Sequence, residues 1–308
     1  MSKVSPEHES KILLSGLAMP ESARWHEGRL WFANWGASEI IAVDLNGKSE
    51  VITGNAPPAF GWSIDWLHDG RLLVTGKELM RLEPDGSMTR HADLSSITEA
   101  GWNEIVVDGR GNTYVNSINF NFLGGERPQS GTGVIALVTP DGDARKVAGD
   151  LSFPNGMVIT PDNSTLVVSE SFTGRLVAFD IASDGSLSKR LVWAEGLGPD
   201  GIKMLGPDGI KMDAEGAIWV QAGDIRAATH RADSPEGAVL RIREGGKVLQ
   251  RIEHDKDIFA VTLGGPDGKT LFMLATAFRG VNRIGEVAAA RIGEVLITKA
   301  PAQGAGWP

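Results

Sequence analysis

The stretch GPDGIKMLGPDGIKMDAEGAIWV, residues 198–220, contains the unit from which most of the chain is built. In its second half, the turn Asp213-Ala-Glu-Gly216 leads into the apolar run Ala217–Val220. The same turn-plus-strand pattern recurs at intervals of about 40–50 residues, which is the period of propeller blades. The other copies begin at His26, His68, Asp108, Pro161 and Pro266.

A second apolar strand and a tight turn such as Asn46-Gly47 or Asp85-Gly86 follow most copies. Asn-Gly and Asp-Gly tolerate the positive φ of hairpin turns, so each unit reads as four short strands. We therefore expect an all-β fold, a six-bladed β-propeller with four-stranded antiparallel blades around a central channel. The alternative is a pair of β-sandwiches or a β-helix, but the period is too long for a β-helix and too regular for sandwiches.

The expected domain organisation is simple. Residues 1–9 are polar and are expected to form a flexible N-terminus, and residues 10–308 are expected to form a single propeller domain. We expect the strand at residues 10–15 to pair with the last blade and close the ring.

The composition excludes several functional classes. The net charge is −9 with no basic run, which disfavours nucleic acid as a partner. The absence of Cys excludes disulfides, a thiolate nucleophile and Cys-ligated zinc. No signal-peptide core or membrane-spanning run is present, so we expect a cytoplasmic monomer or small homo-oligomer with no membrane partner.

The candidate site comes from the loops that lead into the innermost strands, because these loops converge at one end of the channel. Four of them offer a carboxylate or amide at matching positions: Glu21, Asn103, Asn155 and Asp208. Such oxygen ligands suit Ca²⁺, Mg²⁺ or Mn²⁺, with Zn²⁺ also compatible. Taken singly, each of these residues is more typical of an ordinary turn, and only their common blade position favours a site.

The chain also resembles the SMP-30/gluconolactonase/luciferin-regenerating-enzyme-like family. The resemblance is carried in order by PESARWHEGRLWFANW, WNEIVVDGRGNTYV, FPNGMVITPDNSTLVVSES, PDGIKMDAEGAIWV, TLGGPDGKTLFMLATA and the ending GAGWP. It implies a six-bladed propeller with one catalytic divalent metal ion, for which Ca²⁺ is the first expectation. It places the metal ligands on Glu21, Asn155 and Asp208, and a substrate-binding residue on Asn103.

Such a site predicts a hydrolase that opens a lactone to a hydroxy acid, with Asp208 as the general base. Two alternatives use the same metal: a promiscuous esterase or organophosphate hydrolase, and a non-catalytic metal-binding propeller. The three functions predict different partners: a lactone for the lactone hydrolase, an ester or phosphotriester for the second hydrolase, and no substrate for the metal-binding propeller.

One departure from the family bears on the substrate. Sugar lactonases of the family often carry an Arg two residues before Asn103, where this chain has Gly101. Aromatic residues occur in the neighbouring loops, which favours a less polar lactone or ester, and we place Trp102 with Asn103 in substrate binding. The alternative for each aromatic is packing in the blade core. These aromatics are Trp35, Phe60, Trp62, Trp102, Phe120 and Phe122.

Two tandem duplications of eight residues remain. The first offers both Asp200 and Asp208 as ligands; the spacing to Asp213 matches other blades only for Asp208, which we therefore prefer. The second duplication covers residues 283–298 in the last blade, and we expect its even length to keep strand side chains on their original faces.

Overall fold

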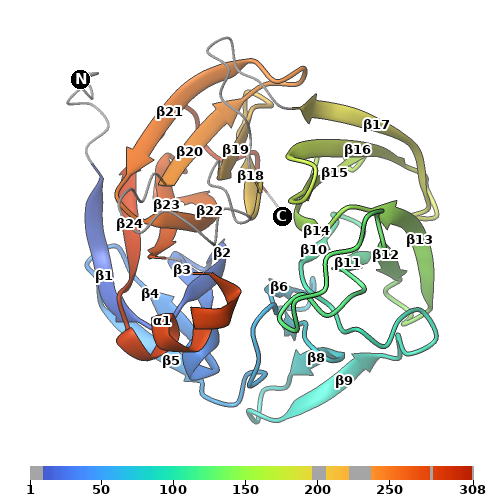
Figure 1. The fold of residues 1–308 in the computed structure, drawn as a ribbon, viewed down its shortest axis with the longest axis horizontal. Coiled ribbons are helices and arrows are strands. Elements are labelled where there is room, and N and C mark those ends of the chain that lie inside the picture. The colour runs from blue at the N-terminus through green and yellow to red at the C-terminus, as the bar shows by residue number, and fades with distance from the viewer. Residues whose placement is uncertain (1–9, 196–205, 222–236, 278–279, 307–308) are drawn as a thin grey trace.

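A computed structural model describes residues 10–195, 206–221, 237–277 and 280–306. Its strands form six separate four-stranded antiparallel sheets, arranged as blades around a channel (Figure 1). The predicted six-bladed β-propeller is therefore confirmed. In each blade except the last, the four strands follow one another from the channel outward in chain order.

The first three blades occupy residues 20–151. Blade 1 comprises β2 (Pro20–His26), β3 (Arg29–Asn34), β4 (Glu39–Val43) and β5 (Ser49–Thr53). Blade 2 comprises β6 (Ile64–Trp66), β7 (Leu72–Val74), β8 (Leu79–Leu82) and β9 (Met88–Ala92). Blade 3 comprises β10 (Ile105–Val107), β11 (Thr113–Ser117), β12 (Gly133–Val138) and β13 (Ala144–Leu151).

The other three blades complete the circle. Blade 4 comprises β14 (Pro154–Ile159), β15 (Thr165–Glu170), β16 (Arg175–Ile181) and β17 (Leu187–Glu195). Blade 5 comprises β18 (Ile210–Met212), β19 (Ile218–Gln221), β20 (Gly237–Ile242) and β21 (Val248–His254). Blade 6 comprises β22 (Asp257–Gly264), β23 (Thr270–Thr276), β24 (Gly293–Lys299) and, from the other end of the chain, β1 (Lys11–Leu17).

Two kinds of contact close the ring. β1 pairs antiparallel with β24, so the N-terminal strand supplies the outer strand of blade 6. Each innermost strand also contacts the innermost strands of both neighbouring blades, including β2 with β22. The N-terminal strand thus covers the edge of β24, and the first and last blades are joined into a closed ring.

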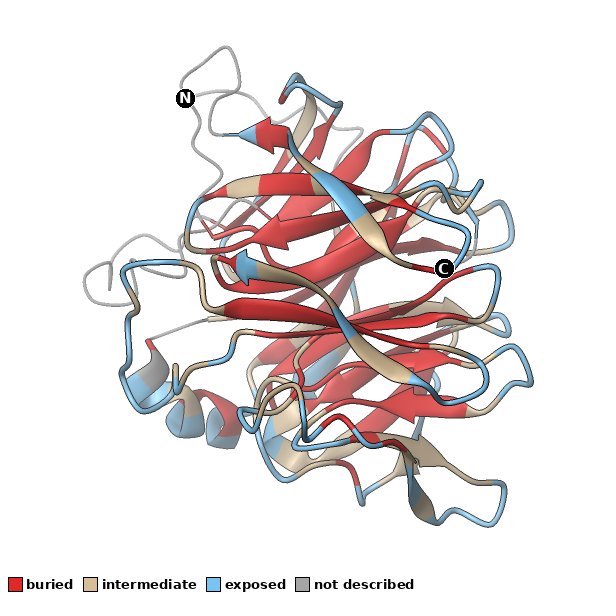
Figure 2. Cartoon of the chain, turned by 90° about the vertical axis from the view of Figure 1, so that its right-hand side faces the viewer, coloured by how far each residue is buried: buried red, intermediate tan, exposed pale blue. Residues whose placement is uncertain are grey.

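The core lies between blades rather than in one centre. Six hydrophobic clusters each combine residues of two adjacent blades, one at every blade interface. Figure 2 shows the inner strands buried, with exposed residues gathered in the turns and along outer strands. Burial of each blade face therefore depends on its neighbour, which fixes the inner strands relative to one another.

The recurring turns have a common physical basis. In the β6–β7 turn, Asp69 Oδ1 accepts the backbone N–H of Arg71, two residues on, at 3.1 Å. The same contact recurs at Asp108, Asp162, Asp213 and Asp267 in the corresponding turns of blades 3 to 6. An Asp that bonds to the backbone in this way favours the turn locally, which explains why the turn was readable in the sequence.

The expectation that both copies of the second duplication lie in strands is wrong. The first copy does not extend a strand: Ile284–Ala290 forms the helix α1, preceded by the short 3₁₀ turn η3 (Val281–Arg283). The second copy supplies β24. The same Ile-Gly-Glu-Val sequence thus begins a helix once and enters a strand once, because only the second copy has β1 and β23 to pair with. α1 packs on η2 (Trp35–Ala37) of blade 1.

Candidate metal and substrate site

The three expected ligand residues occupy the same backbone position in three different blades. Glu21, Asn155 and Asp208 each follow a Pro, and the residue before that Pro has a left-handed backbone. The φ angles are +66° at Met19, +59° at Phe153 and +64° at Gly206. Left-handed Met and Phe are strained, and such strain is typical of backbone held for a function.

Asn103 occupies the equivalent position in blade 3, where Gly101 has φ +87°. Irregular pairing follows directly in blades 1 and 4, between Glu21 and Arg24 and between Pro154 and Met157. Bulges re-aim side chains at the rim of a sheet. The shared conformation therefore sets these loops in register around the channel mouth, and Asn103, Asn155 and Asp208 line one cavity there.

Side chains from the preceding blade hold three of these loops by their backbone oxygens. Thr75 Oγ1 donates to the carbonyl oxygen of Asn103 at 2.5 Å, and Asn116 Nδ2 donates to that of Asn155 at 2.7 Å. Ser169 Oγ donates to the carbonyl oxygen of Asp208 at 2.9 Å. All three bonds join the second strand of one blade, or the residue just after it, to the next blade. Hydrogen bonds thus join blades 2 to 5 to one another at the level of the site.

Close backbone approach completes the arrangement. A Cβ on Gly156 would lie 2.6 Å from the carbonyl oxygen of Asp208, and one on Gly209 would lie 2.9 Å from Cα of Ala260. Only glycine allows blades 4, 5 and 6 to meet this closely. The Gly residues in the Asn155-Gly156 and Asp208-Gly209 pairs are therefore spacing elements of the site.

Three buried carboxylates interact at the centre. Glu21, Glu104 and Asp208 are 2%, 5% and 7% exposed. Burial and the charges of Asp208 and Glu104 raise the pKa of Glu21 well above its usual range. Burial and Glu104 likewise raise the pKa of Asp208, against hydrogen bonds from Asn155 and the Gly209 N–H that lower it. Burial and the neighbouring carboxylates thus disfavour the ionised forms of Glu21 and Asp208.

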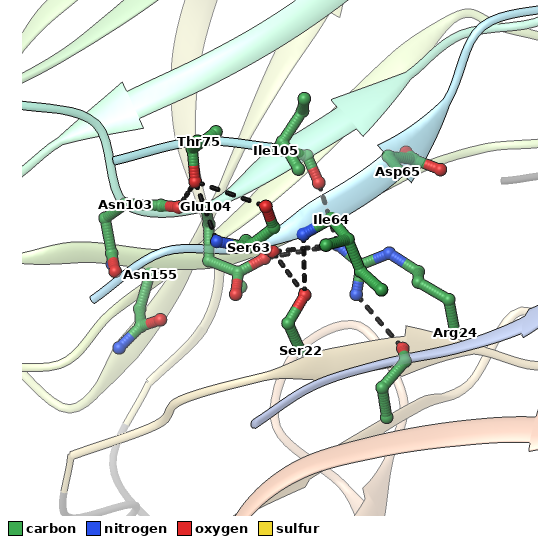
Figure 3. A network of polar contacts seen from close by, with 12 residues as sticks. Ser22, Arg24, Ser63, Ile64, Asp65, Thr75, Asn103, Glu104, Ile105 and Asn155 are labelled. Carbon is green, nitrogen blue, oxygen red and sulfur yellow. Dashed lines mark hydrogen bonds and ion pairs between the residues drawn. The ribbon is translucent and has the colours of Figure 1, made fainter. Parts of the chain in front are cut away.

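Glu104 was missed from the sequence. Arg24 Nη2 approaches its carboxylate at 3.3 Å and also donates to the backbone oxygen of Ile105 at 2.9 Å. Figure 3 shows Arg24 reaching the network of Ser22, Ser63 and Thr75. A cue existed, because Arg24 and Glu104 are opposite charges that closely follow two equivalent site positions, but it depended on knowing which side chains face the channel.

The donor set fits a divalent cation. Two buried carboxylates and a neutral amide, Glu21, Asp208 and Asn155, are hard oxygen ligands, and a cation would offset the burial and the repulsion that raise the two pKa values. Within the described residues, no group of three Asp, Glu, His or Cys side chains is arranged to hold an ion. These side chain types alone therefore do not make up a site there, and Asn155 remains the expected third ligand.

The cavity lined by Asn103, Asn155 and Asp208 has a volume of about 640 Å³, and Glu21 is not among its lining residues. Every aromatic that the sequence placed near the mouth lines it, including Trp102. The alternative of core packing is also met in part, since Trp62 and Trp102 are almost fully buried. Phe153 and Phe259 line the same cavity and were not anticipated.

A family model for the SMP-30/gluconolactonase/LRE-like region matches residues 19–277. The chain belongs to this family. The match includes all six inner strands and every expected site residue. The family resemblance seen in the sequence is therefore confirmed.

Several solved structures share this fold. A calcium-binding protein, regucalcin, from Agrobacterium tumefaciens is 22% identical with a TM-score of 0.73, covering 97% of this chain and 95% of that one. A luciferin-regenerating enzyme is 17% identical with a TM-score of 0.75, covering 96% and 97%. A gluconolactonase from Xanthomonas campestris is 19% identical with a TM-score of 0.70, covering 94% and 89%. At these identities the likeness shows the fold alone.

The geometry of the loop favours glycine at position 101. Its backbone is left-handed, and a Cβ would lie 3.0 Å from the carbonyl oxygen of Gly76. That same oxygen accepts the N–H of Trp102 at 2.6 Å. An Arg at position 101 would therefore require the loop to move, so this mouth is built around glycine.

The competing ligand Asp200 lies outside the described residues. Asp208 has the backbone position shared with Glu21 and Asn155, which supports the preference for it without testing Asp200. The described part of the chain has no helix long and apolar enough to cross a membrane.

Proposed function

We propose that this protein is a divalent-metal-dependent hydrolase that opens a lactone to a hydroxy acid. The observation that carries the proposal is the buried set of Glu21, Asn155 and Asp208, of which Asn155 and Asp208 line a cavity of about 640 Å³. The gluconolactonase named among its structural relatives supports the same reaction class. Of the compatible cations, Ca²⁺ is proposed first, because the ligands are all oxygens and one relative is named as calcium-binding.

Glu21, Asn155 and Asp208 would hold the ion, which when bound supplies positive charge to polarise a carbonyl group and acidify water. Asp208 removes a proton from the attacking water as the water oxygen bonds to the lactone carbonyl carbon. The ring C–O bond then breaks, and Asp208 returns the proton to the departing alkoxide. The product is the hydroxy acid, and no covalent enzyme intermediate is required.

The other polar residues position these groups. The hydrogen bonds from Asn155 and the Gly209 N–H to Asp208 orient its carboxylate. Asn103 lines the cavity and is proposed to donate its amide N–H to the substrate. Arg24 donates to the Glu104 carboxylate and restricts its rotation. The Glu104 carboxylate therefore stays beside Glu21 and Asp208.

The proposal is tested by acid release from δ-valerolactone and glucono-δ-lactone, before and after chelation with EDTA and after return of Ca²⁺, Mn²⁺ or Zn²⁺. We expect chelation, Glu21→Gln and Asp208→Asn each to lower kcat/KM on the lactone hydrolysed by about 100-fold or more. Asp85→Asn is the matched control, because Asp85 also precedes a Gly but caps an exposed hairpin turn. Full activity in EDTA, with no ion retained, contradicts the proposal.

An ester hydrolase is the second candidate, and the aromatic lining of the cavity favours it. Aryl acetates and aryl phosphotriesters, compared with lactones on the same enzyme, separate the two functions by kcat/KM. A wild-type protein that binds Ca²⁺ but hydrolyses none of these compounds would instead be a metal-binding propeller without catalysis.

A further inference from the structure

Eight aromatic residues line the cavity, and some of them come from blades that face each other across the channel. Trp35 belongs to blade 1, whereas Phe153 belongs to blade 4, three blades away in the ring. Phe60, Trp102, Phe120 and Phe122 lie between them along the chain. An aromatic surface is therefore present on both sides of the opening above the carboxylates.

Three phenylalanines, Phe120, Phe122 and Phe153, form one wall of the cavity, and Phe172, which does not line it, packs against all three. Phe120 and Phe122 lie between β11 and β12, Phe153 precedes β14 and Phe172 follows β15. All six pairs of rings are in contact, with centroids 4.9–6.3 Å apart. The guanidinium of Arg127 also lies 4.3 Å from the ring centroid of Phe122. Mutual packing of this kind holds the rings in fixed orientations before any substrate binds.

The opposite wall, formed by Trp35, Phe60 and Trp62, presents the apolar surface of its rings and no free indole N–H donor. Trp35 Nε1 donates to the backbone oxygen of Trp62 at 2.7 Å, and Trp62 Nε1 donates to that of Ala59 at 3.0 Å. Both indole N–H groups are thus occupied within the protein. The Trp35 ring also contacts Phe60 edge-on, with centroids 6.2 Å apart.

Each polar group at the rim has at least one of its atoms engaged within the protein. Lys77 Nζ donates to the backbone oxygen of Glu99 at 2.9 Å, and Glu126 Oε2 accepts the N–H of Asn121 at 2.8 Å. Asn121 Oδ1 accepts the N–H of Gly124 at 2.8 Å. These contacts leave fewer partners at the rim for the hydroxyl groups of a polyhydroxylated lactone, and each hydroxyl left unpaired is costly.

We propose that the substrate is a lactone carrying a flat aromatic group, whose ring binds between the Trp35–Phe60 pair and the phenylalanine wall. The inference rests on the proposed lactone hydrolysis and names its substrate class. A cavity of about 640 Å³ lies within the roughly 300–1,000 Å³ typical of sites for drug-sized ligands, so it has room for a lactone ring and a substituent.

Three δ-lactones with the same six-membered ring test the proposal: δ-valerolactone, its δ-phenyl derivative and glucono-δ-lactone. We expect kcat/KM for the phenyl derivative to exceed that for the unsubstituted ring by about tenfold or more, with the sugar lactone lowest. A phenyl derivative no better than δ-valerolactone, or a preference for glucono-δ-lactone, overturns the proposal.

Phe122→Ala tests the wall directly and should remove most of the preference for the phenyl derivative. Phe179→Leu is the control, because Phe179 is buried in the core between blades 3 and 4 and does not line the cavity. It should leave the ratio between the two lactones unchanged. A preference that survives in Phe122→Ala, or that is lost equally in Phe179→Leu, contradicts the assignment of the wall.

Non-hydrolysable lactams separate this proposal from the proposed function. Calorimetric titration with δ-valerolactam and its phenyl derivative measures binding whether or not the protein is a lactonase. Tighter binding of the phenyl lactam by about tenfold, lost in Phe122→Ala, supports the aromatic subsite even if no lactone is hydrolysed. Equal binding of the two lactams overturns the subsite even if lactones are hydrolysed.

Discussion

Ser169 of blade 4 donates a hydrogen bond of 2.9 Å to the backbone carbonyl oxygen of Asp208 in blade 5. Both residues are buried, and the same hydroxyl lies 3.2 Å from the carbonyl oxygen of Gly156, so that the two oxygens share its one proton. The hydroxyl thus connects the loops that carry Asn155 and Asp208. The position of the proposed base depends on the blade beside it as well as on its own.

Ser169→Ala is expected to leave the carbonyl oxygen of Asp208 without this buried donor. The free energy of unfolding should fall by about 1–3 kcal/mol in urea denaturation. The affinity for Ca²⁺, measured by calorimetry, should fall as well, since Asp208 is less firmly held. Ser87→Ala, which removes a hydroxyl from an exposed turn, is the control. Equal Ca²⁺ affinity in wild type and Ser169→Ala would contradict a positioning role.

The stability of the metal-free protein should depend on pH through Glu21 and Asp208. Their pKa values in the folded protein are raised above the ordinary 4.5 and 3.8. Between the ordinary and the raised values, the folded protein therefore binds more protons than the unfolded chain. The stabilisation is complete below the ordinary values and is lost as the pH rises through the folded values, at about 1.4 kcal/mol for each pKa unit.

Glu21→Gln isolates this effect. Burial lowers the pKa of His26 and His91, which destabilises the folded protein on acidification below about 6.5 and opposes the carboxylates. Those histidines are unchanged in the variant, so the difference between wild type and Glu21→Gln removes their contribution. In EDTA, Glu21→Gln should be the more stable protein at pH 8, and its advantage should shrink towards pH 5. A constant difference across this range would be inconsistent with the raised pKa.

Arg24 and Glu104 should show strong energetic coupling. Their side chains are 20% and 7% exposed, so loss of one partner leaves a largely buried charge. We expect Arg24→Met to cost about 3 kcal/mol and the double variant with Glu104→Gln to recover part of it. A double-mutant cycle from urea denaturation measures the coupling. The exposed pair Arg90 and Glu78 is the control and should show a coupling below about 1 kcal/mol. Additive losses for Arg24 and Glu104 would contradict the prediction.

The close approach of blades 4 and 5 is tested by Gly156→Ala. The added Cβ would meet the backbone of Asp208, which cannot move aside as a flexible side chain can. Overpacking should cost about 1–3 kcal/mol in the free energy of unfolding and weaken Ca²⁺ binding. Gly54→Ala is matched, because its Cβ would meet nothing within 4 Å and its φ is not left-handed. The two variants behaving alike would show that the spacing is not critical.

The fold was predictable because its signal is local and repeated. An Asp that bonds to the N–H two residues on produces the same turn in blade after blade, and the strands after it are short and apolar. The positions of Glu21, Asn155 and Asp208 followed from the register that this repeat sets. The structure places all three in one backbone conformation, although their role as ligands remains a prediction.

The remaining features depend on contacts between blades. Two examples are the pair of Glu104 and Arg24 and the pair of Phe153 and Phe122. Each pair joins two blades, so a local sequence pattern does not predict the contact. The helix α1 was missed for a sharper reason: its first residues repeat those that enter β24, so local sequence could not separate helix from strand. Tertiary pairing decides such cases.

Calorimetric titration of Ca²⁺ into wild type, Asp208→Asn and Asp200→Asn tests the central claim most directly. The account predicts one ion bound by wild type and by Asp200→Asn, and none by Asp208→Asn, with lactone hydrolysis following the same order. Circular dichroism verifies that all three proteins are folded. One ion bound by Asp208→Asn with the wild-type affinity, and its loss in Asp200→Asn, would contradict the assignment of Asp208 as ligand and base.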